Sequence, residues 1–252
     1  MHAHLIDPLL KIAVEAGKKI MDIYQDTTSW NVEIKDDKSP LTRADKEAHL
    51  VIEKGLKQFS SLYPIISEEG KNISYEERKN WPLFWLVDPL DGTKEFIKRN
   101  GQFTVNIALI ENKIPVMGVI YAPATEELFY GIKGMGAFKS FNGTLTELHT
   151  SPRRVSLIAV GSSSHASEED ALYLRSYDIV ETIKSGSSLK FCKVAEGLAD
   201  LYLRTGPTME WDTAAGQCIA ESAGAIMTKL DGNAFMYNKE NLLNPGFVCK
   251  NA

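Results

Sequence analysis

The stretch 84–97 constrains the fold most, because an apolar segment in it runs directly into two aspartates. Residues 84–87 are all apolar and predict a short buried strand, whereas residues 94–101 predict a short helix. Asp88 and Asp91 lie between these two elements. Two carboxylates at the end of a buried strand are costly unless a positive charge neutralises them. A hard divalent cation suits this place, because it takes several oxygen ligands at once.

The turn that holds the two aspartates also has features that suit an anion. Pro89 fixes one backbone angle, Gly92 allows close approach to the backbone, and amides at the start of the next helix attract negative charge. An Asp91-Gly92 pair by itself is more often an ordinary turn. Asp88 before it and Thr93 after it favour a functional interpretation. The sequence therefore predicts Mg2+ and a phosphate bound side by side in one short turn.

Composition narrows the class of protein. The chain has 252 residues, 44% hydrophobic and 24% charged, so it can bury a large core as one large domain or two packed subdomains. A net charge of -5 argues against the broad basic surface that a nucleic acid polymer needs. Cys192, Cys218 and Cys249 lack paired spacing, which indicates free thiols in a reducing compartment. No apolar run approaches the roughly 20 residues of a membrane span, and the N-terminus lacks a signal core.

We therefore expect a cytoplasmic protein without an integral membrane segment, either a monomer or a homodimer. Peripheral association with the cytoplasmic face of the inner membrane is the weaker alternative, because no basic or strongly amphipathic segment supports it.

The pattern of elements changes along the chain. An amphipathic helix is predicted over 5–24, and a β-hairpin over 103–110 and 115–121. The second half alternates strands with helices, which predicts an α/β layer. Its predicted strands are 156–160, 178–182 and 199–203. The fold class is therefore α/β (α+β), and we expect two halves, residues 1–150 and 151–252.

Further acids occur in comparable contexts. Asp45 opens a predicted helix, and Thr42 three residues before it resembles a capping box, which by itself explains the aspartate. Glu68 and Glu69 follow a predicted strand at 65–66. Adjacent side chains there point in opposite directions, so we expect Glu68 to face a shared site and Glu69 to lie behind it.

The second half adds one acid and two polar loops. Asp212 lies in a segment predicted to be helical over 210–224, and it is explained either as a helix cap or as a further metal ligand. The loops 161–165 and 186–190 each join a strand to a helix and are able to contact phosphate or sugar. Helix capping explains each loop by itself equally well. Lys190 is explained equally well as a lysine exposed to solvent.

Taken in order, these pieces resemble one enzyme family. They match the signature of the Mg2+-dependent, lithium-inhibited phosphomonoesterases, which include inositol monophosphatase, fructose-1,6-bisphosphatase and the 3'(2'),5'-bisphosphate nucleotidases. The matching residues are Asp45, Glu68-Glu69, Asp88-Pro-Leu-Asp-Gly-Thr93 and Trp211-Asp-Thr-Ala-Ala215. The closer resemblance is to the bacterial CysQ-type nucleotidases, in the blocks 85–105, 186–192, 194–197, 206–208 with 211–212, and 243–247. The resemblance implies a layered αβαβα sandwich with the site between its halves.

The resemblance also implies an activity. A Mg2+-dependent phosphomonoesterase of this kind hydrolyses adenosine 3',5'-bisphosphate (PAP) to AMP and phosphate, in sulfur assimilation and nucleotide recycling. The sulfated nucleotide 3'-phosphoadenosine 5'-phosphosulfate (PAPS) is a second expected substrate. One alternative is an inositol monophosphatase, which shares the metal motifs. The other is a sensor that binds Mg2+ and nucleotide without turnover, and the presence of every expected ligand argues against it.

Residue roles follow from the same resemblance. It implies two Mg2+ ions and leaves a third open. The first is expected on Glu68, Asp88 and the Leu90 carbonyl, and the second on Asp88, Asp91 and Asp212. In this scheme most metal ligands belong to the first half, and the last ligand and the nucleotide contacts to the second.

The remaining expected roles concern the water and the substrate. Thr93, supported by Asp45, is expected to orient and deprotonate the attacking water, and Glu68 is counted with these catalytic residues. The amides of Gly92 and Thr93 are expected to hold the scissile phosphate. The expected nucleotide contacts are Ser162, His165, Ser187 and Lys190. One departure is Ser163, where the nucleotidases usually carry arginine.

Overall fold

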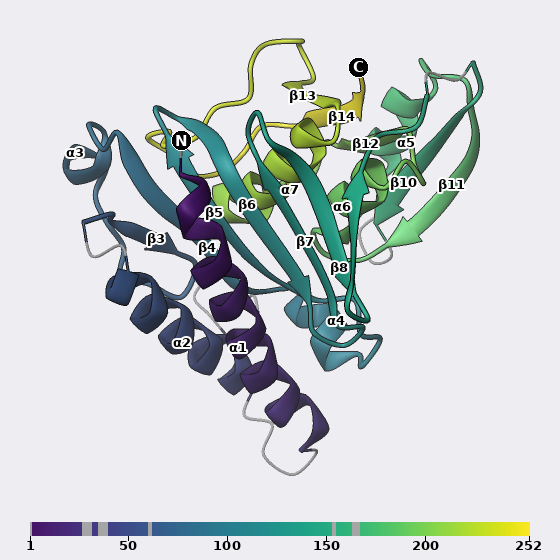
Figure 1. Cartoon of the computed structure of the whole chain (residues 1–252). Coiled ribbons are helices and arrows are strands. Elements are labelled where there is room, and N and C mark those ends of the chain that lie inside the picture. The colour runs from purple at the N-terminus through teal and green to yellow at the C-terminus, as the bar shows by residue number, and fades with distance from the viewer. Residues whose placement is uncertain (1, 27–31, 35–39, 60–61, 153–154, 163–166) are drawn as a thin grey trace.

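The computed structural model describes residues 2–26, 32–34, 40–59, 62–152, 155–162 and 167–252. Two sheets are stacked with helices between and outside them, as Figure 1 shows. The layers are α1 with α2, a seven-stranded sheet, α6 with α7, a five-stranded sheet, and α5. This order confirms the predicted αβαβα arrangement.

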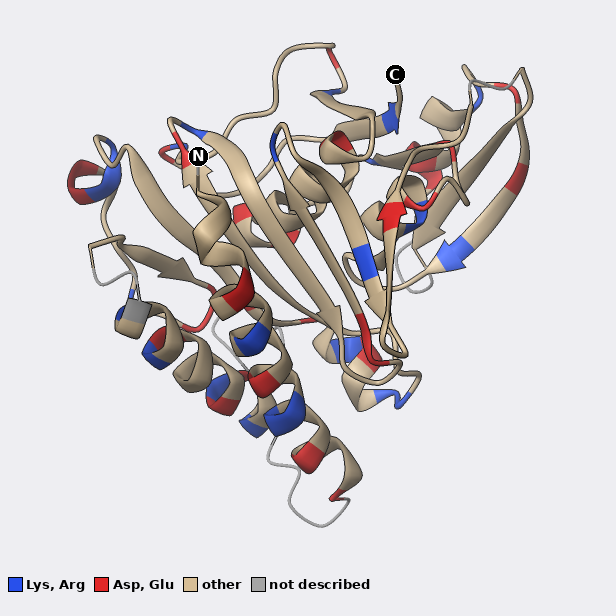
Figure 2. Cartoon of the chain, in the orientation of Figure 1, with Lys and Arg blue, Asp and Glu red and all other residues tan. Residues whose placement is uncertain are grey.

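The outer layer consists of α1 (Ile6–Gln25), which follows a 3-10 turn at Ala3–Leu5, and α2 (Arg43–Phe59). The apolar positions of α1 recur every three or four residues and are buried, as the sequence predicts. Gly55 lets the two helices approach closely, because a Cβ atom there would lie 2.6 Å from Ile12. Acidic and basic residues are interspersed along the two helices (Figure 2). Neither helix, among the described residues, is apolar enough over its length to cross a bilayer.

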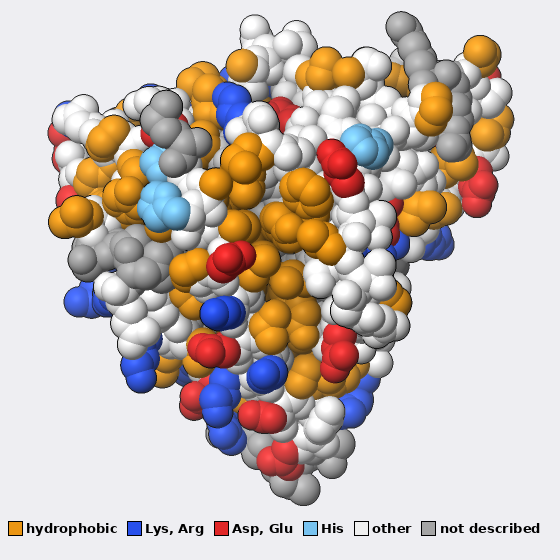
Figure 3. All heavy atoms as spheres, in the orientation of Figure 1, with side chains coloured by type: hydrophobic (Ala, Val, Ile, Leu, Met, Phe, Trp, Pro, Cys, Tyr) orange, Lys and Arg blue, Asp and Glu red, His pale blue; other side chains and the backbone are white. Residues whose placement is uncertain are grey.

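The seven-stranded sheet has the order β3-β4-β5-β6-β7-β8-β9. Only β3 and β4 are parallel, and the predicted hairpin of β5 and β6 is confirmed. Apolar side chains gather on the exposed surface beside α1 on the face seen in Figure 3. The strands are β3 (Ile65–Ser67), β4 (Leu83–Asp91), β5 (Thr104–Glu111), β6 (Ile114–Ala122), β7 (Glu127–Ile132), β8 (Gly136–Phe141) and β9 (Thr144–Leu148). A separate short pair joins β1 (Val32–Ile34) to β2 (Pro40–Thr42), and a short helix α3 covers Tyr75–Arg78.

Strand β4 runs farther than the sequence predicts. The predicted strand ends at Val87, but β4 continues through Asp91 and pairs with β5 on both sides of an irregularity between Asp88 and Asp91. Pro89 lies in this irregularity and has no N–H for the ladder. The following helix α4 covers only Thr93–Ile97. Both aspartates are therefore held by a sheet rather than by a free turn.

The five-stranded sheet has the order β11-β10-β12-β14-β13. The strands β10, β11 and β12 fall at the three predicted positions, whereas β13 and β14 were not predicted. The strands are β10 (Leu157–Ser162), β11 (Ile179–Ser185), β12 (Leu201–Arg204), β13 (Ala225–Lys229) and β14 (Phe247–Asn251). The helices of this part are α5 (Glu168–Leu174), α6 (Leu189–Ala195) and α7 (Glu210–Ser222).

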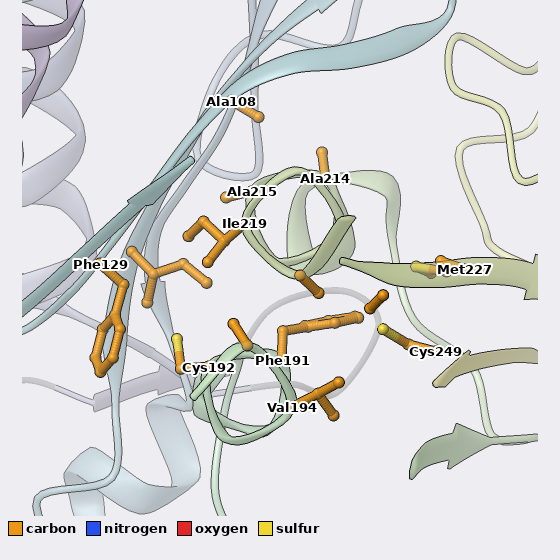
Figure 4. Close-up of a cluster of buried hydrophobic side chains, with 14 of the residues drawn as sticks. Ala108, Phe129, Phe191, Cys192, Val194, Ala214, Ala215, Ile219, Met227 and Cys249 are labelled. Carbon is orange, nitrogen blue, oxygen red and sulfur yellow. The ribbon is translucent and has the colours of Figure 1, made fainter. Parts of the chain in front are cut away.

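A single apolar core joins α6 and α7 to both sheets (Figure 4). It includes Phe191, Ile219 and, as the sequence predicts, unpaired cysteines, of which Cys192 and Cys249 are labelled in the figure. Glycines allow this close packing, because a Cβ atom at position 216 would lie 2.1 Å from Phe191. The two sheets divide between residues 148 and 157. Because α7 packs on the larger sheet and belongs to the second half, the division into two domains stays a prediction.

Candidate active site

A pocket of about 360 Å³ opens where the ends of β4, β10 and β12 meet the first turns of α4, α6 and α7. It brings together most of the predicted site residues from both halves. Those that line it are Glu68, Asp88, Leu90, Asp91, Gly92, Thr93, Ser162, Ser187, Lys190 and Asp212. Glu69 is absent from the lining, and Asp45 lies behind Thr93. His165 lies outside the described residues, as does Ser163.

The acidic wall of the pocket brings together one buried carboxylate, Asp88, and the half-buried Glu68, Asp91 and Asp212. Asp88 is 2% exposed, and burial followed by the charges of Glu68 and Asp91 raises its pKa well above the usual range. Burial and the same neighbouring acids raise the pKa of Asp212 in the same way. Ionising all these carboxylates together therefore costs free energy, and a cation among them would offset that cost.

Asp91 is fixed by residues from both halves of the chain. Its Oδ2 accepts hydrogen bonds from Ser187 Oγ at 2.6 Å and Ser188 Oγ at 2.7 Å. Asn106 Nδ2, on β5, lies 3.4 Å from the same oxygen and donates to Ser188 Oγ at 2.9 Å. Thr104 Oγ1 is 2.6 Å from Ser187 Oγ. The Ser187 hydroxyl, which was expected on the nucleotide, thus lies on a carboxylate of the acidic wall.

Close approach of the two halves explains two backbone conformations. Gly92 has a positive φ of 92°, and a Cβ atom there would meet Gln102 O at 3.1 Å and Ser187 Cβ at 3.3 Å. Ser187 itself has a φ of 52°, which is unusual for a residue with a side chain. Such conformations persist where the surroundings fix them, and here they bring the start of α6 against the end of β4.

Thr93 and Asp45 form the pair expected to act on water. Thr93 Oγ1 donates to Asp45 Oδ1 at 3.2 Å and lies 3.4 Å from the Leu90 carbonyl oxygen. Asp45 Oδ2 accepts from Thr42 N at 2.8 Å and from the Thr42 hydroxyl. Asp45 therefore caps α2 with one oxygen and contacts Thr93 with the other. One side chain thus serves both as a cap of α2 and as the partner of Thr93.

Asp212 occupies a different helix position from the predicted cap. It lies in the third position of α7, and its Oδ2 accepts from Met209 N at 2.8 Å. Met209 is the residue that precedes the helix. The side chain thus closes the first turn of α7 from inside while it also lines the pocket.

Lys190 is buried, so the alternative that it is simply an exposed lysine is wrong. It is 4% exposed, its Nζ donates to the Ser187 carbonyl, and it lies over the Tyr202 ring at 5.4 Å. Burial lowers the pKa of Lys190 to about 8, although Asp91 opposes this shift. The side chain therefore supplies a donor, and below that pKa a positive charge, in the same pocket as the acids.

Arg204 is a lining residue that was not predicted from the sequence. It ends β12, and its Nε is buried with no hydrogen-bond partner among the described residues. Its Nη2 lies 3.3 Å from the Pro207 carbonyl oxygen. An unsatisfied guanidinium nitrogen at a pocket is suited to an anion. The available signal was a basic residue at the end of a predicted strand, beside Gly206-Pro207.

The acidic residues fit Mg2+ in an open site. Within the described ranges, no three acidic, histidine or cysteine side chains converge closely enough to enclose an ion by themselves. One oxygen of Asp91 and one of Asp212 are already used in hydrogen bonds. Mg2+ usually keeps water molecules and shares its coordination with substrate phosphates, so a carboxylate-lined pocket that leaves room for both suits it.

Three comparisons with known proteins agree on the family. The model of the inositol monophosphatase family matches residues 2–251. The 3'(2'),5'-bisphosphate nucleotidase CysQ of Salmonella typhimurium is 45% identical over 244 residues, covering 96% of this chain and 98% of that protein. The crystal structure of CysQ from Bacteroides thetaiotaomicron has a TM-score of 0.85 and 42% identity, and the match covers 97% of each chain.

A more distant structure shares the fold. An IMPase/NADP phosphatase complexed with Mg2+ and phosphate is 22% identical with a TM-score of 0.80, over 100% of this chain and 92% of that one. This chain and that structure therefore share a sandwich of alternating helices and sheets, and in this chain acids line the pocket. The chain belongs to the inositol monophosphatase family. The family resemblance inferred from the sequence is thereby confirmed.

Proposed function

We propose that this chain is a Mg2+-dependent 3'(2'),5'-bisphosphate nucleotidase that hydrolyses PAP to AMP and phosphate, with PAPS as a second substrate. The observation that carries the proposal is the division of charge in the pocket. Glu68, Asp88 and Asp91 of the first half line the same pocket as Lys190 and Arg204 of the second half. Such a pocket suits a substrate with two phosphate groups, one beside the acids and one beside the cations. The 45% identity to a nucleotidase supports the same substrate.

The acidic wall would hold two Mg2+ ions. Glu68, Asp88 and the Leu90 carbonyl are assigned to the first, and Asp88, Asp91 and Asp212 to the second, with a third left open. Bound Mg2+ supplies charge neutralisation of the phosphate and lowers the pKa of a bound water. The amides of Gly92 and Thr93 orient the scissile phosphate at the start of α4.

The chain's own residues would then move one proton. Thr93 Oγ1 donates its hydrogen to Asp45 Oδ1, which leaves an Oγ1 lone pair to accept the proton of the attacking water. Transfer to Asp45 Oδ1 completes the relay as the water oxygen bonds to phosphorus, and the bond from phosphorus to the 3'-oxygen breaks. The leaving 3'-oxygen takes a proton from solvent to become the 3'-hydroxyl of AMP. The Thr42 contacts keep Asp45 in place during this transfer.

The basic wall would hold the nucleotide. Lys190 and Arg204 are assigned to the second phosphate, and Ser162 to the sugar or a phosphate of the nucleotide. Because the Ser187 hydroxyl is bonded to Asp91, its direct contact with the nucleotide stays a prediction. His165 keeps its predicted nucleotide role, outside the described residues. Three buried free thiols fit a reducing compartment, so we assign the activity to the cytoplasm.

The test is phosphate release from PAP, inositol 1-phosphate and fructose 1,6-bisphosphate, each with Mg2+ and then with EDTA. We expect fast, EDTA-sensitive release from PAP, together with inhibition by Li+. Release mainly from inositol 1-phosphate would replace the nucleotidase by an inositol monophosphatase. Tight binding of PAP without any release would instead favour a non-catalytic sensor.

A further inference from the structure

The segment 238–244 contacts the residues that lead into Asp212, and we propose that it positions this metal ligand. The segment belongs to the long connection between β13 and β14 and is irregular. It carries Lys239 and Asn244, and its partners include Glu210 at the start of α7. The inference rests on the proposed function only in treating Asp212 as a metal ligand.

Glu210 is the centre of these contacts. Its side chain is fully buried at 0% exposure, although it is only two residues from Asp212. Its Oε2 accepts from Asn238 N at 2.7 Å, and its Oε1 accepts from Lys239 N at 3.0 Å and Lys239 Nζ at 2.6 Å. A buried carboxylate with three donors, one of them charged, has few alternative positions. The first residue of α7 is therefore fixed from outside the helix.

Asn244 fixes the residues just before the helix. Its backbone N donates to the Thr208 carbonyl at 2.7 Å, and its Nδ2 lies 2.7 Å from the Met209 carbonyl oxygen. Its Oδ1 accepts from Lys239 Nζ at 2.9 Å, which joins it to Glu210. Met209 is the residue whose N–H binds the Asp212 carboxylate. The residues that lead into Asp212 and the donor that orients its side chain are thus held by one segment.

The other end of the segment is attached to the first half of the chain. Arg78, the last residue of α3, is 3% exposed and donates to Asn238 Oδ1 at 2.8 Å, the Lys239 carbonyl at 2.7 Å and the Glu240 carbonyl at 2.9 Å. Asn238 Nδ2 donates back to the Arg78 carbonyl at 2.7 Å. The other acids of the pocket belong to the first half. The segment therefore sets the position of Asp212 relative to those acids.

The consequence is that Glu210 and Lys239 act as positioning residues for Mg2+, although neither touches it. Outer residues that orient a metal ligand typically change metal affinity about 10- to 100-fold when they are replaced. We expect Glu210→Gln to raise the Mg2+ concentration for half-maximal activity about tenfold. A purely structural role would instead lower thermal stability and leave the Mg2+ dependence unchanged.

Asp200 supplies a matched control. It is 2% exposed and, like Glu210, accepts several hydrogen bonds, from the Ser151 hydroxyl, Ile158 N at 2.8 Å and Asn251 Nδ2 at 2.9 Å. It does not line the pocket. Asp200→Asn is therefore expected to lower the melting temperature without changing the Mg2+ dependence by more than about twofold.

The experiment compares both variants with the unaltered protein in two measurements. The first is Mg2+-dependent phosphate release from PAP, and the second is the rise in melting temperature with added Mg2+, which needs no turnover. Weaker Mg2+ dependence in both measurements for Glu210→Gln alone supports the inference. Equal Mg2+ dependence in Glu210→Gln and the unaltered protein overturns it.

A second variant keeps the test decisive if Glu210→Gln does not fold. Lys239 is 26% exposed at its side chain, and Lys239→Met removes its Nζ hydrogen bonds to Glu210, Asn244 and the Met236 carbonyl while the two backbone donors to Glu210 remain. We expect a rise of about threefold to tenfold in the Mg2+ requirement, with recovery in Lys239→Arg. An unchanged requirement overturns the inference. Failure of the unaltered protein to hydrolyse PAP concerns the proposed function instead, because the melting measurement still reports on Asp212.

Discussion

The two walls of the pocket are built in different ways. The acidic wall from the first half is nearly continuous in sequence, with Asp88, Asp91 and Thr93 at the end of one strand and the start of one helix. The wall from the second half is assembled from several elements, so that Lys190 and Arg204 come from α6 and β12, while α7 adds Asp212 to the acids. The first wall concentrates negative charge that needs a cation. The second supplies cations and hydroxyls that suit a phosphate.

This difference indicates that the first half supplies most of the groups assigned to the metal and the water, whereas the second half supplies groups that position them. The backbone of Asp88 and Asp91 is held in the ladder between β4 and β5. The second wall depends on contacts between segments distant in sequence, such as Ser188 with Asp91, or Asn244 with Met209. Substitutions in the first wall should therefore abolish turnover, whereas those in the second should change affinity.

The largest effect is expected for Asp88→Asn. The amide keeps the shape but removes a carboxylate assigned to both Mg2+ ions, so we expect kcat to fall at least about 10³-fold. Steady-state kinetics at saturating Mg2+, with circular dichroism as the control for folding, measures this. Activity within tenfold of the unaltered protein would contradict the ligand assignment.

Thr93→Val tests the relay with a side chain of similar shape. Without the hydroxyl there is no group between the water and Asp45, so we expect kcat to fall about 10²-fold while KM stays nearly constant. Thr125→Val, which removes a hydroxyl bonded to Glu127 on the surface, serves as the control. A change confined to KM would assign Thr93 to binding instead.

Arg204→Met addresses the second wall. Loss of a charged donor to a phosphate costs about 1.5–3 kcal/mol, so we expect KM for PAP to rise about 10- to 100-fold with little change in kcat. Turnover of inositol 1-phosphate, which has no second phosphate, should change less. An equal loss for both substrates would place Arg204 outside the nucleotide contacts.

The two walls of the pocket also differ in how much of their structure could be predicted from the sequence. The pattern of apolar residues and acids in 84–93 was sufficient for the first wall, because its ligands are neighbours in sequence. The same pattern did not predict the full length of β4, since the ladder with β5 extends the strand past Asp88. The resemblance supplied the pairing of Thr93 with Asp45, which no local pattern contains.

The second wall was less predictable. Ser188 and Glu210 gave no signal, because their roles depend on hydrogen bonds to residues far along the chain. Lys190 was explained equally well as exposed, since a short helix of seven residues has too few positions to define a buried face. Strand β14 was not predicted. It lies at the end of the chain and pairs antiparallel with both β12 and β13.

Metal removal gives a smaller effect on stability. Mg2+ at about 100 times its dissociation constant should add about 2.7 kcal/mol to the free energy of unfolding. Asp88→Asn should lose most of this gain, yet be at least as stable as the unaltered protein in EDTA, because it removes one charge from a repelling group. Thermal denaturation with Mg2+ and with EDTA measures both. An equal Mg2+ gain in the variant would remove Asp88 from the site.

The smallest effect concerns Glu221, a carboxylate at the other end of α7 that contrasts with the acidic wall. Burial raises its pKa, but Gln217 Nε2 donates to it at 2.9 Å and no other acid is among the causes of the shift. A carboxyl whose pKa is raised on folding binds protons more tightly in the folded state. Stability therefore falls as pH rises from the ordinary value through the raised pKa.

Glu221→Gln should flatten this part of the pH profile and change the free energy of unfolding at pH 7 by about 1 kcal/mol or less. Urea denaturation from pH 4 to pH 8, with and without Mg2+, gives both quantities. We expect the Mg2+ gain to be unchanged, because Glu221 has no part in the pocket. A buried carboxylate satisfied by neutral donors needs no cation, whereas carboxylates that face one another do. A Mg2+-dependent change at Glu221 would show that burial alone, rather than mutual repulsion, creates the demand for the metal.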